Sequence, residues 1–97
     1  MTENQRFDSV FDRIQAAKKR PAFKTWPQFS LTVMLSERFL GLGNLPMAEF
    51  EICKAENILL TSEIRAMALK IGSAVLPDVE YFLAQGRIDA ALELVLA

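Results

Sequence analysis

The chain has 97 residues, of which 52% are hydrophobic and 24% charged, a composition that suits one folded core and excludes an intrinsically disordered polymer. It contains no histidine and a single cysteine, so the commonest general base, the usual partner of a serine or cysteine nucleophile and a transition-metal ligand set are missing. We therefore expect neither an enzyme nor a metal or cofactor protein.

The formal net charge is −1, but the charges are unevenly distributed. Residues 1–27 carry six basic and three acidic side chains, and the remainder is acidic, which predicts a basic end. No apolar stretch reaches the roughly 18 to 20 residues that span a bilayer, and the first residues are polar. We expect a cytoplasmic protein without a membrane partner, with Cys53 as a small buried apolar residue.

The first predicted helix covers residues 3–19. Thr2 and Gln5 have the spacing of a capping box, and apolar residues then recur at steps of three and four. Arg20-Pro21 ends this helix, because a residue that precedes proline disfavours the α conformation.

A basic and aromatic linker, residues 21–27, follows the first helix. With the end of that helix it contains Lys18, Lys19, Arg20, Lys24 and Trp26. These residues could bind phosphates and stack on a base, or meet an acidic protein surface. The alternative is a solvated loop whose aromatic residues anchor the first helix to the core.

The middle of the chain predicts a helical hairpin. A second capping box, Thr25 with Gln28, opens a helix over residues 26–40, and Gly41-Leu42-Gly43-Asn44 ends it and caps the next one. The third helix runs from residue 45 to about 57. We expect Ala48, Ile52 and Ala55 to face inward, together with Cys53 or Phe50.

The last third of the chain predicts three shorter helices. Thr61-Ser62-Glu63 restarts a helix to Gly72, Pro77 opens a short helix through Gln85, and residues 87–96 form the last one. The prediction is an all-α protein with five or six short antiparallel helices. We expect one domain over residues 1–97, made of an N-terminal helix (1–20), the linker (21–27) and helical hairpins (28–97).

The hairpin resembles a tetratricopeptide repeat over residues 29–62. Leu35, Ser36 and Phe39 fall on the large, small and aromatic positions of its first helix, Gly43-Asn44-Leu45 matches the turn, and Ala48, Ile52 and Ala55 match the second helix. Residues 78–96 match in part, with Gly86 at the turn. The resemblance implies an array of helical hairpins with a concave peptide-binding face; a compact helical bundle is the alternative.

These features predict a non-catalytic interaction module, such as an adaptor, chaperone or inhibitor, that binds a helix or peptide of another protein or a second copy of itself. The alternative is a nucleic-acid or ribonucleoprotein binder that uses residues 18–26. The chain ends in an apolar helix without a polar cap, which also suggests a covered surface. The candidate contact residues are Lys18, Lys19, Arg20, Lys24, Trp26, Phe50, Leu94 and Leu96.

Overall fold

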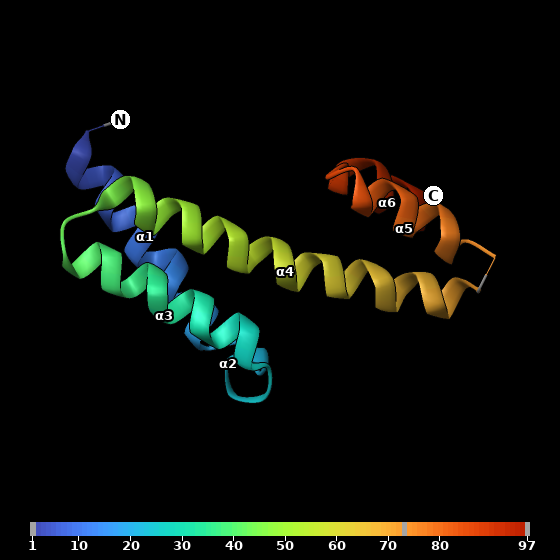
Figure 1. Cartoon of the computed structure of the whole chain (residues 1–97), viewed down its shortest axis with the longest axis horizontal. Helices are drawn as coiled ribbons and strands as arrows, with labels where there is room; N and C mark the ends of the chain where they lie inside the picture. The colour runs from blue at the N-terminus through green and yellow to red at the C-terminus, as the bar shows by residue number, and fades with distance from the viewer. Residues whose placement is uncertain (1, 73, 97) are drawn as a thin grey trace. The chain divides into compact units, whose positions relative to one another are not determined.

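The computed structural model of the protein describes residues 2–72 and 74–96, which form six helices and no strand. The helices are α1 (Glu3–Lys18), α2 (Ala22–Thr25), α3 (Pro27–Gly41), α4 (Leu45–Ile71), α5 (Leu76–Ala84) and α6 (Ile88–Leu96) (Figure 1). The prediction of an all-α fold is confirmed. The chain divides into two compact units, unit 1 (Met1–Ile58) and unit 2 (Leu59–Ala97), and α4 contributes to both.

Helix α1 begins as predicted. Thr2 Oγ1 accepts a hydrogen bond from the Gln5 backbone N–H, and Gln5 Oε1 accepts one from the Thr2 backbone N–H. Val10, Ile14 and Ala17 are buried. Phe7 and Phe11, which belong to the same three-four apolar pattern, are 43% and 47% exposed, so the apolar face of α1 is only partly packed.

The predicted linker contains a helical turn, because α2 lies within it. The predicted capping box of α3 is wrong. Trp26 is the N-cap and has no side-chain capping bond, while the Thr25 hydroxyl donates to the Pro21 carbonyl at 3.2 Å. Pro27 still opens α3, where its missing N–H costs no helical hydrogen bond.

The turn between α3 and α4 is built by Gly43 and Asn44. Gly43 adopts a left-handed conformation with φ 78°, which glycine tolerates without strain. The Asn44 N–H donates to the Phe39 carbonyl and Asn44 Oδ1 accepts from the Met47 N–H, so the predicted cap is confirmed. Behind the turn, the fully buried Ser36 hydroxyl donates to the Ala48 carbonyl at 2.6 Å, which holds the two helices together at close range.

Helix α4 is one continuous helix of 27 residues, so the predicted break near residue 58 and restart at Thr61 are wrong. No glycine or proline occurs between Met47 and Ile71, and serine and threonine alone rarely interrupt a helix. The buried positions of α4 end one series at Ala55 and begin another at Ile64, and that change of phase resembles a gap between two helices.

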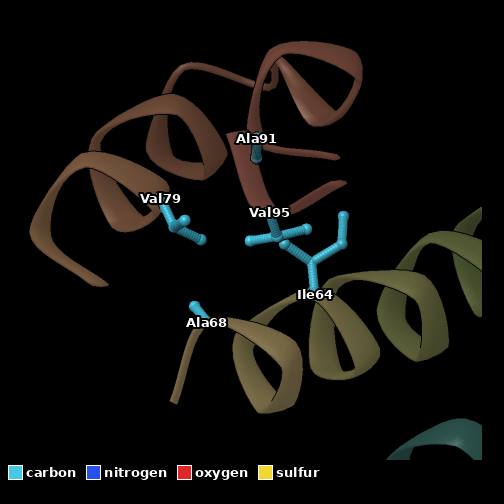
Figure 2. Close-up of a cluster of buried hydrophobic side chains, with 5 residues drawn as sticks. All are labelled: Ile64, Ala68, Val79, Ala91 and Val95. Carbon is cyan, nitrogen blue, oxygen red and sulfur yellow. The ribbon is translucent and has the colours of Figure 1, made fainter. Parts of the chain in front are cut away.

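The core of unit 2 is small and entirely aliphatic. Ile64 and Ala68 from α4, Val79 from α5, and Ala91 and Val95 from α6 point toward one another (Figure 2). Half-buried apolar side chains surround this cluster. The unit is therefore held together by apolar contact between three helices.

Candidate interaction surface

The basic segment lies at the end of α1 and along α2. Its cations Lys18, Lys19, Arg20 and Lys24 line one shallow hollow together with Pro21 and Thr25. Lys18 Nζ already binds Glu37 Oε2 of α3 at 2.8 Å. Trp26 is half-buried and lies outside this lining, so the structure brings the four predicted cations together but not the aromatic residue.

The predicted apolar contact residues differ in exposure. Phe50 is 59% exposed, which contradicts the expectation that it faces inward and keeps it available for contact. Leu96 is exposed, whereas Leu94 is half-buried against the unit 2 core. Ala97, at the end of the predicted uncapped helix, lies outside the described residues.

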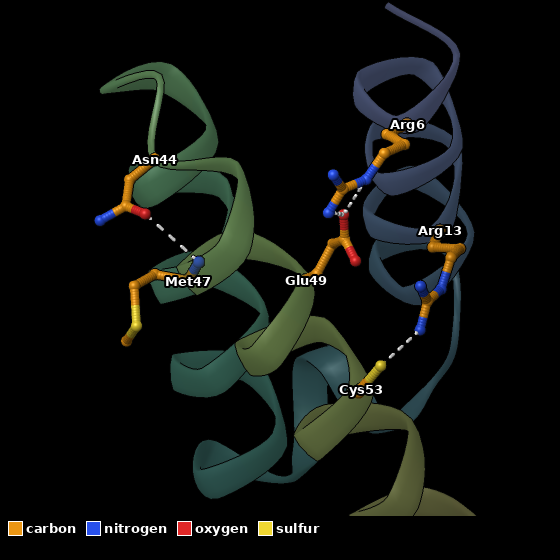
Figure 3. Close-up of polar contacts among 6 residues, drawn as sticks. All are labelled: Arg6, Arg13, Asn44, Met47, Glu49 and Cys53. Atoms are coloured by element: carbon orange, nitrogen blue, oxygen red, sulfur yellow. Dashed lines mark hydrogen bonds and ion pairs between the residues drawn. The ribbon is translucent and has the colours of Figure 1, made fainter. Parts of the chain in front are cut away.

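Polar contacts cover the side of α4 that faces α1 (Figure 3). Arg6 binds Glu49 at 2.7 Å, and Arg13 binds Glu56 and donates a hydrogen bond from Nη2 to Cys53 Sγ at 3.0 Å. The hydrogen bonds that the Arg13 guanidinium donates to the Glu56 carboxylate raise the pKa of Arg13 further above its ordinary value. These contacts leave little of this side of α4 for a partner.

Cys53 is exposed, so the prediction of a buried cysteine is wrong. Ala48, Ile52 and Ala55 fill the buried face of this part of α4, and Cys53 lies one position beyond Ile52, toward α1. Adjacent residues on a helix point about 100° apart, which explains why an apolar residue here is not in the core.

Helix α3 has apolar side chains on two sides. Phe29, Val33 and Leu40 are buried, but Leu31, Met34, Leu35 and Leu42 are between 40% and 72% exposed. Their spacing places these four on one face of the helix, opposite the buried one. Met47 and Phe50 of α4 are also exposed. We call these six exposed residues of the α3–α4 hairpin the hairpin surface: Leu31, Met34, Leu35, Leu42, Met47 and Phe50.

Glu51 is a buried charged residue of the same hairpin, and sequence reasoning missed it. It is 5% exposed, and its Oε2 atom has no hydrogen-bond partner among the described residues. Lys54 Nζ lies 3.7 Å from this atom, beyond hydrogen-bond distance. The signal was present in the sequence, because Glu51 falls three residues after Ala48 and four before Ala55, on the predicted inner face.

The described residues contain no group of three acidic, cysteine or histidine side chains that could hold a metal ion. Ser62, interpreted from the sequence as a helix cap, lies in the interior of α4, so that interpretation is wrong. Likewise, no helix in this part of the chain combines the length and hydropathy needed to cross a membrane.

Comparisons with protein families, with curated proteins and with solved structures found no match to this chain.

Proposed function

We propose that this protein is a non-catalytic interaction module that binds an amphipathic helix of another protein on the hairpin surface. The observation that carries the proposal is the outer face of α3, where Leu31, Met34 and Leu35 are exposed, together with the C-cap residue Leu42, on a helix whose opposite face is already packed. Single exposed apolar residues are common on proteins, but contiguous ones mark interaction sites.

The kind of partner follows from the spacing of these residues. Leu31 and Leu35 lie one turn apart on one face of α3, and Leu42, its C-cap residue, follows about two turns after Leu35. A partner helix with apolar residues at i, i+3, i+4 and i+7 offers a matching stripe. An adaptor, chaperone or inhibitor role, in the cytoplasm, fits such binding.

Two features of the hairpins support a tetratricopeptide-like architecture as part of this proposal. Ser36 and Ala48, at small positions of the repeat pattern, are both fully buried and in contact. In addition, the turns after α3 and α5 have the same hydrogen bonds: Asn44 N–H to the Phe39 carbonyl, and Arg87 N–H to the Phe82 carbonyl. Repeated turns of one geometry favour an array of similar hairpins.

The test uses synthetic 16-residue amphipathic helical peptides with varied apolar stripes and the full-length protein. We expect a subset to bind and to shift the backbone amide NMR signals of α3 and the first turns of α4. Leu31→Lys should weaken binding at least tenfold. Leu69→Lys is the matched control, because Leu69 is a leucine of α4 outside the hairpin surface and is 62% exposed, against 60% for Leu31 of α3. No binding by any peptide, or equal losses in both variants, contradicts the proposal.

Nucleic-acid binding is a second candidate, supported by the four cations around one hollow. Binding of single-stranded RNA or DNA should then weaken steeply between 50 and 200 mM salt, because counterions are released when cations meet phosphates. Replacing Lys19 and Lys24 with alanine should remove it. Salt-independent binding, or binding that survives the double replacement, excludes this candidate.

A further inference from the structure

Glu51 is an unusual residue for the interior of a helical hairpin. Its side chain is 7% exposed, and one carboxylate oxygen is fully buried without a donor among the described residues. Buried charges in folded proteins are normally paired and hydrogen-bonded. The available cation, Lys54, is 53% exposed and 3.7 Å away, so it compensates the charge without supplying a hydrogen bond.

The position of Glu51 relates it to the hairpin surface. The hydrogen bond between Ser36 and Ala48 fixes how α3 and α4 are aligned. Glu51 lies about one turn after Ala48. Since the two helices of a hairpin run in opposite directions, Glu51 lies beside the part of α3 that is about one turn before Ser36. Leu31 and Leu35 belong to that part of α3, and both are exposed.

Neighbouring groups of α3 do not satisfy the carboxylate. Thr32 is the buried polar residue at this level, and its hydroxyl donates to the Gln28 carbonyl at 2.8 Å. A hydroxyl has one proton to donate, so it is already used. The buried Glu51 oxygen therefore stays without a donor among the described residues.

We propose that Glu51 is the charged anchor of the hairpin surface, and that it binds an arginine of the partner helix beside the helix's apolar stripe. This inference rests on the proposed function and specifies the partner. In this proposal the half-exposed Lys54 side chain, whose Nζ lies 3.7 Å from the carboxylate, moves aside for the incoming group. The apolar residues of the partner then cover Leu31 and Leu35.

Arginine fits this position better than lysine. Its planar guanidinium presents several N–H donors in a fixed arrangement that matches both oxygens of a carboxylate, and it is less strongly hydrated than an ammonium group. Lys54 already provides an ammonium at the site without forming a hydrogen bond. A partner lysine would reproduce that incomplete contact, whereas a guanidinium supplies the absent donors.

The experiment compares paired peptides on the full-length protein. A 16-residue amphipathic peptide that binds the hairpin surface is made as a series, in which each member has arginine at one polar position beside the apolar stripe. Each member is made again with citrulline at that position, because citrulline has a similar shape but no charge. Affinities are measured for the wild type, Glu51→Gln and Glu49→Gln. Glu49→Gln is the matched control, since Glu49 lies on the same helix but binds Arg6 of α1.

At one of the tested positions, we expect the citrulline peptide to bind the wild type and Glu49→Gln about tenfold more weakly than the arginine peptide does. Glu51→Gln should bind the two peptides equally. Equal binding of arginine and citrulline peptides to the wild type would overturn this inference while leaving the proposed function intact. If no peptide binds, the proposed function fails as well. If the chain self-associates and Leu31→Lys abolishes the self-association, the hairpin surface binds a second copy of the chain, and this result also overturns the inference. Thermal unfolding shows whether each variant is folded.

Discussion

Truncation of Ile64 to alanine should unfold unit 2 and leave unit 1 folded. Ile64 is fully buried in the aliphatic cluster of unit 2. Replacing a buried isoleucine with alanine costs about 2 to 5 kcal/mol. Domains are stabilised by roughly 0.05 to 0.15 kcal/mol per residue, so the 39 residues from Leu59 to Ala97 have about 2 to 6 kcal/mol in total. The loss is therefore comparable with the whole stability of the unit.

Backbone amide NMR of the full chain measures the outcome residue by residue. In Ile64→Ala, signals from α5 and α6 should collapse toward random-coil positions, while those from α1 and α3 keep their dispersion. Ile52→Ala is the matched variant, because Ile52 is an equally buried isoleucine of the same helix but belongs to unit 1. If either truncation removes all signals together in one transition, the two units do not have separate stability and the reasoning is refuted.

Three further predictions concern single polar groups. Ser36→Ala should lower the free energy of unfolding by about 1 kcal/mol, because it removes the hydrogen bond to the Ala48 carbonyl; an unchanged denaturant midpoint would contradict this. Glu51→Met should leave stability equal or raise it by about 1 kcal/mol, since a buried carboxylate oxygen without a donor is removed; a loss above about 2 kcal/mol in chemical denaturation would show that the carboxylate stabilises the fold. Arg65 lowers the pKa of Glu80, so this ion pair stabilises unit 2 at pH values above the ordinary carboxyl pKa. The stabilisation is lost as the pH falls through the lowered pKa of Glu80. The melting temperature of the wild type should accordingly exceed that of Glu80→Gln at pH 6, and the difference should shrink as the pH falls below the ordinary carboxyl pKa.

The fold could be predicted where local chemistry decides the outcome. The Thr2 cap and the turn at Gly43-Asn44 are specified by side chains that bond to nearby backbone groups, and both appear in the sequence as short motifs. The continuity of α4 could not be predicted in this way. It depends on which face is buried, and that face changes phase between Ala55 and Ile64.

The site was less predictable because burial is a tertiary property. Leu35 and Ser36 are neighbours in sequence, yet the serine is fully buried and the leucine is 40% exposed. In a helix that is apolar on two sides, hydropathy does not identify the packed side. The contact between Ser36 and Ala48 identifies it, because only a small residue allows the helices to approach so closely.

The α3–α4 hairpin breaks two rules of stable folding at one place. Glu51 is a buried charge without a full set of donors, and Leu31 and Leu35 are exposed apolar residues at the same level of the hairpin. Each is unfavourable in the free protein, and departures of this kind are expected at functional sites. The proposed partner would remove both, because its apolar helix face would cover the leucines while its arginine donates to Glu51. Unit 2 also has exposed apolar residues, such as Leu69 and Tyr81, but among its described residues no buried side-chain oxygen or nitrogen lacks a partner. The combination distinguishes the hairpin surface from ordinary exposed apolar residues and makes it the first place to look for a partner.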